Sequence, residues 1–220
     1  YSDTSLMDRY YCDSHNKEFI IYTDSSFKNI NKINDYPKIK SHLDKFKKII
    51  TSDNKPYGLH RSRDEKFFIS DKIVVPRKCK FPSFVFCDFN AYFSAAFYII
   101  STNRINLKYL TALFNSNLIR FWLLKKGKMQ GSIYQIDKEP LLEIPIHKSE
   151  NLNVENNIIS LVNQMIITKK SEMEAITERD KEYLKQKCSN IDNQLNGLIY
   201  EMYGILNQSE IDLIENYFSE

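Results

Sequence analysis

The chain has 220 residues, with 31 Lys and Arg against 28 Asp and Glu, so its net charge of +3 does not by itself indicate a nucleic-acid binder. Hydrophobic residues make up 42% of the chain and aromatic residues 13%, which is enough for a core and excludes bulk disorder. The charge is unevenly distributed, because residues 1–150 carry a net +9 and residues 151–220 a net −6. The composition therefore predicts a basic domain followed by an acidic segment.

Targeting and redox features point to the cytoplasm. No apolar stretch reaches the about 18–20 residues that a membrane-spanning helix needs, and the first residues are polar. The four cysteines, Cys12, Cys79, Cys87 and Cys188, include no Cys-x-x-Cys pair, and their spacing to His60 matches no zinc module. We therefore expect a cytoplasmic protein with no membrane partner and no metal site. Because the first residue is not methionine, we also expect the chain to be a piece of a longer protein.

The first 50 residues predict a hairpin and then a helix. Aromatic and β-branched residues at 10–12 and 19–22 flank the turn-like segment 13–16, which favours two antiparallel strands. After Pro37, apolar residues recur every three to four positions, as in an amphipathic helix. The opposite face of this helix is rich in lysine: Lys38, Lys40, Lys45, Lys47 and Lys48.

The central part of the chain predicts a small sheet with one long helix. Short β-rich runs occur at 72–76, 83–87, 96–101, 132–136 and 141–146. Between the third and fourth runs, apolar spacing over 106–126 predicts a single helix that ends at Gly127. Because strands and helices do not alternate regularly, we expect an α+β domain over residues 1–147.

The remaining segment, 148–220, predicts only helices. Its apolar residues repeat near helical period from Asn151 onward, and Gly204 is a plausible helix stop. Asn207, with Glu210 three residues later, has the pattern of an N-cap followed by a capping box. We therefore expect a helical hairpin or coiled-coil-like arm that ends in one further short helix.

The sequence lacks the motifs of several enzyme classes. Its five glycines form neither a Walker loop nor a dinucleotide fingerprint, and no Pro-Pro-aromatic motif for a flipped base is present. The segment 60–64 superficially resembles a kinase catalytic loop, but the Gly-rich loop and metal-binding triplet of kinases are missing. Asp88 is the only strand-like acid of the kind a metal-dependent nuclease clusters. We therefore predict no catalytic residues in this chain.

Basic residues interleaved with aromatics and amides suggest a DNA reader instead. Lysine contacts phosphates, the arginine fork fits the major-groove edge of guanine, and glutamine can pair with adenine. The alternative for any one such cluster is an ordinary solvated surface. The candidate DNA-binding residues are Arg61, Arg63, Arg77, Lys78, Lys80, Lys125, Lys126, Lys128, Gln130 and Tyr134.

Several short strings, in a fixed order, also resemble a known family. They are YPKI (36–39), YGLHRSR (57–63), KIVVPR (72–77), YLTALFNS (109–116), LLEIPI (141–146) and LIYEMYGI (198–205). Together they are similar to the TaqI-like C-terminal specificity domain of adenine-specific DNA methyltransferases and single-chain type IIG restriction-modification enzymes. Phe114, Met202 and Ile205 stand where the family pattern usually has leucine.

The resemblance implies that the chain is a DNA target-recognition domain over 1–147 with a C-terminal helical region over 148–220. It implies that double-stranded DNA is the partner and that the chain itself is not an enzyme. The methyltransferase domain, which binds S-adenosylmethionine, and a nuclease domain when present, would lie N-terminal to it in the same polypeptide. This chain would then bind no cofactor. Separately, the high content of Lys, Asn and Ile suggests an AT-rich bacterial genome. The base-contacting residues of the family vary with the target sequence, so the resemblance does not assign them.

Two other functions remain open at the level of sequence. The helical segment could recruit a partner protein, in which case the chain is an interaction module and the basic residues serve solubility. The chain could also be a fragment of a type I-like specificity subunit, in which long helices space two recognition domains. The presence of one predicted α+β domain disfavours the second alternative.

Overall fold

The computed structural model describes residues 1–16, 18–50, 54–59 and 62–218. The chain forms two compact units. The main unit comprises Tyr1–Asn16 and Ile69–Glu220, and the inserted unit comprises Lys17–Phe68. Both contain helices, and the strands are antiparallel within each small sheet, so the predicted α+β class is confirmed. The boundary expected between residues 147 and 148 falls inside the main unit.

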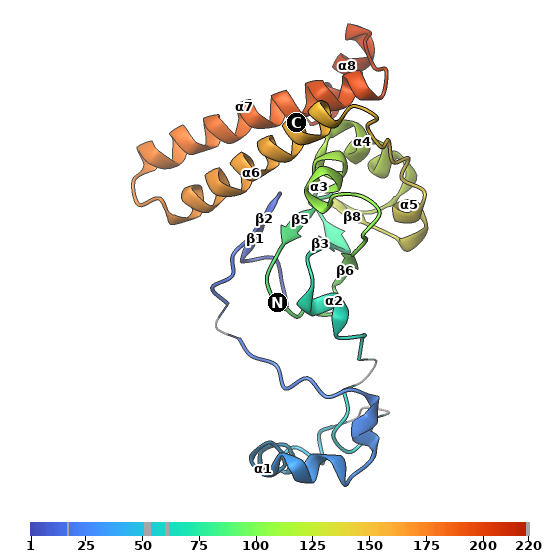
Figure 1. The fold of residues 1–220 in the computed structure, drawn as a ribbon, viewed down its shortest axis with the longest axis vertical. Helices are drawn as coiled ribbons and strands as arrows, with labels where there is room; N and C mark the ends of the chain where they lie inside the picture. The colour runs from blue at the N-terminus through green and yellow to red at the C-terminus, as the bar shows by residue number, and fades with distance from the viewer. Residues whose placement is uncertain (17, 51–53, 60–61, 219–220) are drawn as a thin grey trace. The chain divides into compact units, whose positions relative to one another are not determined.

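A three-stranded sheet lies at the centre of the main unit (Figure 1). Its middle strand is β3 (Lys72–Pro76), which pairs with β5 (Val85–Cys87) on one side and β6 (Phe97–Ile100) on the other. Every residue of β3 and β5 is buried, because helices and loops cover the sheet. The strands expected near 72–76, 83–87 and 96–101 are therefore confirmed.

The hairpin expected from segments 10–12 and 19–22 is wrong. Instead β1 (Met7–Asp8) pairs with β2 (Tyr11–Cys12), and residues 19–22 form no strand. The turn between β1 and β2 places Tyr10 at a φ of 75°, in the left-handed region. Tyr10 also bonds through its backbone to Phe84 and Phe86 around β5. Strand β5 therefore lies beside Tyr10, where the expected hairpin would have placed residues 19–22.

The helix expected over 106–126 is two helices, α3 (Leu107–Asn115) and α4 (Asn117–Lys126). Ser116 between them has extended backbone, and its side chain accepts a hydrogen bond from the Ile119 N–H as the N-cap of α4. Serine is a preferred N-cap because its hydroxyl satisfies an N–H that has no partner in the helix. The Asn115 amide bonds both the N–H and the carbonyl of Phe84, at 2.9 and 2.7 Å, which fixes the break against β5.

A second three-stranded sheet has the order β4–β8–β7. Its strands are β4 (Lys78–Cys79), β7 (Lys128–Gln130) and β8 (Ile133–Gln135), which confirms the strand expected near 132–136. The strand expected over 141–146 is wrong, because α5 (Lys138–Leu142) occupies its beginning and the rest has no regular structure. Pro145 has no N–H for a sheet, and its carbonyl accepts a hydrogen bond from the Tyr203 hydroxyl at 2.7 Å.

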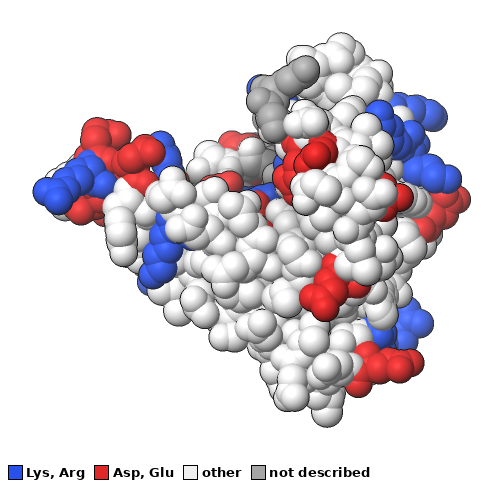
Figure 2. Space-filling model, turned by 90° about the horizontal axis from the view of Figure 1, so that it is seen from above, with Lys and Arg blue, Asp and Glu red and all other residues white. Residues whose placement is uncertain are grey.

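The C-terminal helices form the expected hairpin from α6 (Leu152–Glu174) and α7 (Glu178–Met202). Gly204, at a φ of 71°, follows α7, and Asn207 caps the last helix, α8 (Gln208–Glu215), before the 3-10 turn η3 (Asn216–Phe218). The surface of this hairpin carries mixed charges at its far tip, and uncharged residues cover most of the face that Figure 2 shows. The net negative charge of the segment is therefore dispersed.

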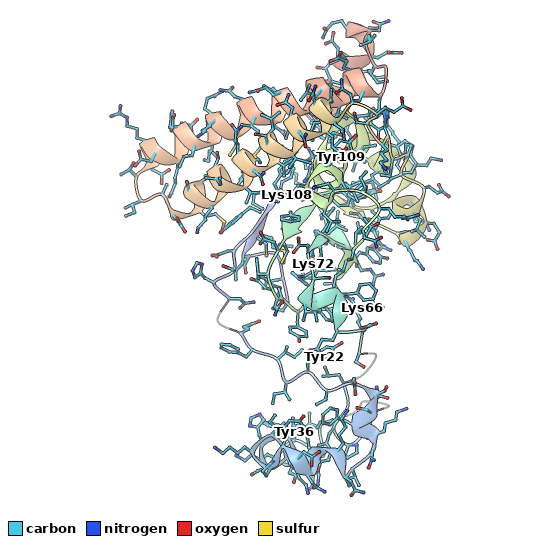
Figure 3. The ribbon with its side chains drawn as sticks, viewed as in Figure 1. Tyr22, Tyr36, Lys66, Lys72, Lys108 and Tyr109 are labelled. Atoms are coloured by element: carbon cyan, nitrogen blue, oxygen red, sulfur yellow. The ribbon has the colours of Figure 1, made fainter. Side chains whose placement is uncertain are left out.

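This hairpin shares a hydrophobic core with the rest of the main unit. Leu195 and Ile199 of α7 and Val162 of α6 pack in one cluster with Leu113 of α3. Tyr109, also on α3, is fully buried, and its hydroxyl donates a hydrogen bond to the His147 carbonyl at 2.9 Å (Figure 3). The helices therefore complete the main unit, because their apolar faces cover α3.

The inserted unit contains short helical elements. They are the 3-10 turns η1 (Ser25–Lys28) and η2 (Lys32–Asp35), then α1 (Pro37–Asp44), with α2 (Lys66–Ile69) at its end. The helix expected after Pro37 is confirmed over Pro37–Asp44, but residues 45–49, which include Lys45, Lys47 and Lys48, form turns. Ile33, Tyr57 and Phe68 are buried, and the Thr23 hydroxyl bonds the Tyr57 carbonyl at 2.6 Å. In neither unit is any described helix long and apolar enough to cross a bilayer.

Candidate nucleic-acid interface

The β4–β8–β7 sheet gathers three of the predicted DNA-binding residues on one face. Lys78 of β4 and Lys128 of β7 both pair with Gln135 of β8, so the three residues form one row across the sheet. Directly paired residues in a sheet project to the same face. Gln130, two residues after Lys128, projects to that face as well. We call this set, Lys78, Lys128, Gln130 and Gln135, the polar sheet face.

Hydrogen bonds orient the amides on the polar sheet face. The Gln130 Nε2 donates to Gln135 Oε1 at 3.1 Å, and the Gln135 Nε2 donates to Asp137 Oδ1 at 2.8 Å. Lys128 lies 3.8 Å from the other carboxylate oxygen of Asp137, and 81% of its side chain is exposed. Lys78 and Gln130 are exposed too. The face therefore presents two cations, an ordered pair of amides and one exposed isoleucine, Ile133, which pairs with Gln130.

Strands β7 and β8 form a two-stranded ribbon with a two-residue turn. Gly131 in this turn has a φ of 63°, a conformation that glycine adopts without steric cost. Lys128, Gln130 and Gln135 all lie on one side of the ribbon. Strand β4 pairs with β8 only at Tyr134 and Gln135, so the turn end of the ribbon, from Gln130 to Ile133, is two-stranded, as in ribbons that fit the major groove of B-form DNA.

Tyr134 corrects one of the sequence expectations. Its side chain is fully buried, and its hydroxyl donates a hydrogen bond to the Leu123 carbonyl of α4. Burial raises the pKa of Tyr134 to about 12. The reason for its burial is the alternation of a strand, since Tyr134 projects to the side opposite Gln135. Tyr134 is therefore a core residue that holds the sheet against α4, and it cannot contact DNA directly.

Because Gly127 lies close to the Tyr134 ring, a larger residue at position 127 is expected to lower the stability of the protein. A methyl group at position 127 would lie 1.9 Å from the Tyr134 Oη, so we expect Gly127→Ala to destabilise the protein by about 1–3 kcal/mol. A methyl group on Gly197 in α7 would have no atom within 4 Å, so Gly197→Ala should stabilise the protein by about 0.5–1 kcal/mol. Urea unfolding of both variants measures the two effects. Equal urea midpoints for the Gly127→Ala and Gly197→Ala variants would contradict the packing of Tyr134 against Gly127.

Arg77 lies between the two three-stranded sheets of the main unit. Its N–H donates to the Ala96 carbonyl at 2.8 Å, and its own carbonyl accepts from Ile136 at 2.9 Å. Its guanidinium is exposed and lies 5.1 Å from the centroid of the Tyr98 ring. Arg77 is therefore held at the join of the sheets with its charge accessible, next to β4.

The remaining predicted lysines of the main unit are exposed but lie against aromatic rings. Lys125 Nζ is 4.6 Å from the Tyr217 ring centroid, and Lys126 Nζ is 5.6 Å from that of Trp122. Both lie at the C-terminal end of α4, where a cation is favoured by the helix dipole. Lys80 Nζ lies 5.8 Å from the Phe81 ring centroid. Each of these lysines keeps its charge at the surface.

A pocket that the sequence did not predict adjoins β4. Lys78 and Lys80 line it together with two arginines, Arg9 and Arg120. Arg120 is buried, and its Nε donates to the Pro82 carbonyl at 3.0 Å, which fixes the loop after β4. Burial and the neighbouring Arg9 lower the pKa of Arg120 to about 10. Nothing in the sequence pattern marked either arginine, because their partners are distant along the chain.

The predicted arginine loop belongs to the inserted unit. Arg61 lies outside the described residues. Arg63 is half-buried, its carbonyl accepts a hydrogen bond from the Tyr22 hydroxyl, and both residues line a pocket of this unit. Tyr22 and Tyr36, labelled in Figure 3, line the same pocket. Of the lysines on the expected basic helix face, Lys38, Lys45, Lys47 and Lys48 are exposed.

Comparison with known proteins identifies the family. The model of the TaqI-like C-terminal specificity domain matches residues 7–146, which is more than half of the chain. The chain belongs to this family. No curated protein sequence matches it. The match spans both units and includes the whole polar sheet face. A specificity domain is a non-catalytic module, and membership in this family supports DNA recognition in a restriction-modification system.

Proposed function

We propose that this TaqI-like specificity domain recognises a specific sequence in double-stranded DNA, with the polar sheet face in the major groove. The observation that carries the proposal is the row Lys78–Gln135–Lys128 together with Gln130 on the β7–β8 ribbon. Lysines on such a face contact phosphates and set affinity, whereas an oriented glutamine amide can pair with the edge of adenine. The hydrogen bond from Gln130 to Gln135 supports this role because it limits the rotation of both amides.

The flanking basic residues extend this surface. Arg77, Lys80, Lys125 and Lys126 are exposed in the main unit, and we propose that they contact the DNA backbone near the ribbon. The inserted unit supplies a separate set of exposed lysines and Arg63. We propose that it provides further contacts to the same duplex, because its net charge from the sequence is positive.

The parent protein in this proposal is an adenine-specific DNA methyltransferase of the type II class, with or without an endonuclease domain. The specificity domain holds the duplex while the methyltransferase domain of the same polypeptide binds S-adenosylmethionine and the flipped adenine. We propose that such an enzyme acts in the bacterial cytoplasm. The support for this parent is the family alone.

A direct binding experiment tests the proposal. The chain is mixed with a randomised pool of duplexes over a salt series, binding is followed by fluorescence anisotropy, and the retained DNA is sequenced. We expect affinity to fall steeply with salt and one sequence motif to be enriched. Steep salt dependence without enrichment would contradict sequence reading by the isolated chain. Absence of binding at low salt would contradict DNA recognition altogether.

A second candidate function rests on the far end of the α6–α7 hairpin. Ile176 in the turn is 94% exposed, and Tyr183 on α7 and Ile167 on α6 are also largely exposed. Exposed apolar residues of this kind are typical of protein contacts. We propose that this end contacts another protein surface. Ile176→Ser with Tyr183→Ser should weaken such a contact in a pull-down with the methyltransferase domain and leave DNA affinity unchanged.

A further inference from the structure

Two buried cysteines lie on neighbouring parallel segments of the main unit. A parallel bridge pairs Tyr10, beside β2, with Val85 of β5. Two backbone hydrogen bonds fix this register: Tyr10 N–H to the Phe84 carbonyl at 3.0 Å, and Phe86 N–H to the Tyr10 carbonyl at 3.2 Å. Cys12 and Cys87 each follow two residues after the bridged pair. Both cysteines therefore lie at matching positions on neighbouring segments of the chain.

The two cysteines are neighbours in the core. Their side chains are 4% and 0% exposed, and each thiol shifts the pKa of the other. Neighbouring extended segments lie about 5 Å apart, within the range of Cα separations that a disulfide bridges. Both cysteines are reduced in this structure. The backbone therefore already holds two thiols where a disulfide could form.

We propose that Cys12 and Cys87 are an intramolecular disulfide site, oxidised by exchange with a low-molecular-weight disulfide such as glutathione disulfide. In the first step local opening exposes Cys87, and its thiolate attacks glutathione disulfide, which forms a mixed disulfide and releases one glutathione thiolate. Cys12 then loses its proton and attacks the Cys87 sulfur, which releases the second glutathione. The two protein thiols are oxidised by two electrons, and one glutathione disulfide is reduced to two glutathione molecules.

The surroundings favour Cys87 as the attacking thiol. The neighbouring Cys12 thiol lowers the pKa of Cys87, and the nearby ammonium of Lys72 lowers it further. Lys72 pairs with Cys87 across β3 and β5, is fully buried, and donates to the Ser70 and Phe89 carbonyls at 2.7 and 2.8 Å (Figure 3). The same thiol pairing raises the pKa of Cys12. Cys87 is therefore the thiol of the pair that loses its proton more readily.

The other two cysteines have different neighbours. The Cys79 thiol lies 4.0 Å from the Tyr134 carbonyl, and the Cys188 thiol lies 3.8 Å from the Glu172 carboxylate. Burial raises the pKa of each to about 11. Both remain thiols under conditions that oxidise the Cys12–Cys87 pair.

The disulfide would close a loop that contains the whole inserted unit. Residues 17–68 lie between the two cysteines in the sequence. The bond would therefore join the strand that precedes the inserted unit to a strand that follows it. Its formation adds a covalent link at the base of the insertion without a change in the register of β2 and β5.

The test equilibrates the intact chain with mixtures of reduced and oxidised glutathione and then blocks free thiols with N-ethylmaleimide. The incubation is run on the native protein and during refolding from urea, so that burial cannot hide the reaction. We expect a loss of two hydrogens in the intact mass, two alkylated cysteines in place of four, and a proteolytic peptide that links Cys12 to Cys87.

Matched variants separate this site from nonspecific oxidation. Cys79→Ser with Cys188→Ser keeps the proposed pair and should form the disulfide at the same redox potential as the unmodified chain. Cys12→Ser and Cys87→Ser should each form no intramolecular disulfide. A linked peptide that contains Cys79 or Cys188, a glutathione adduct that persists on Cys87, or four free thiols in both incubations would each overturn the proposal.

Discussion

Replacing both Lys78 and Lys128 with alanine should weaken DNA binding and reduce its dependence on salt. Each lysine that neutralises a phosphate contributes about one unit to the slope of log affinity against log salt concentration, so we expect the double variant to reduce the slope by about two. The two side chains are exposed and share one row of the β4–β8–β7 sheet. Their removal should therefore leave the fold intact, which thermal unfolding would verify.

The matched control for this variant removes two positive charges from another part of the chain. Lys185 and Lys187 are exposed on α7, in the segment that carries net negative charge. We expect Lys185→Ala with Lys187→Ala to leave the salt slope unchanged. Equal slopes for the two double variants would contradict the assignment of the polar sheet face to DNA, because the effect would then follow total charge alone.

A Gln130 variant distinguishes base recognition from phosphate contact on the polar sheet face. If its amide pairs with a base, Gln130→Ala should cost about 1–3 kcal/mol on the preferred sequence and relax the preference at one position. The salt slope should stay the same, since glutamine carries no charge. Sequencing of the DNA retained by this variant measures the change in preference. An unchanged motif would assign Gln130 a supporting role only.

Leu195→Ala should destabilise the whole main unit, by about 2–5 kcal/mol. Leu195 on α7 is 1% exposed and packs in the cluster that joins the helical hairpin to α3. Truncation removes transfer energy and leaves a cavity that a rigid core fills incompletely. Because α3 shares this core with the hairpin and packs on the sheet through Leu110 and Phe114, helix signal and Trp122 fluorescence should be lost in one transition during urea unfolding.

An exposed leucine provides the control for this prediction. Leu213 on α8 is 65% exposed, so we expect Leu213→Ala to change stability by less than about 0.5 kcal/mol. If Leu195→Ala instead unfolds the helices at a lower urea concentration than the sheet, the C-terminal region is a separate cooperative unit. That result would contradict the shared core as a source of cooperativity.

The polar sheet face and the core around Leu195 are connected parts of one structure. The polar sheet face depends on Tyr134, which holds β8 against α4 through its hydrogen bond to Leu123. Helix α4 in turn contacts α7, where the Asn117 N–H bonds the Asn196 side chain at 2.8 Å. The helical hairpin therefore supports the ribbon indirectly, because it buries the helices on which the ribbon packs.

Local signals in the amino-acid sequence were enough to predict many of the elements. The apolar strand 72–76, the helix after Pro37, and the N-cap at Asn207 follow from residues within a few positions of one another. The helical period after residue 151 likewise predicted α6 and α7. Alternation in the strand near 132–136 even contained the information that Tyr134 and Gln135 project to opposite faces. The family could be inferred from the order of its short strings.

Which of these elements meet depends on long-range contacts that the folded chain alone reveals. Pairing of Lys78 and Lys128 with the same residue of β8 joins segments about 50 positions apart, and no local pattern encodes that register. Tyr10 pairs with β5 instead of segment 19–22, because burial of its whole side chain outweighs the local turn signal. The proximity of Cys12 to Cys87 arises in the same way. Long-range strand pairing therefore determines both the candidate interface and the thiol pair. Backbone hydrogen bonds can form between almost any two segments, so side-chain packing decides which segments pair.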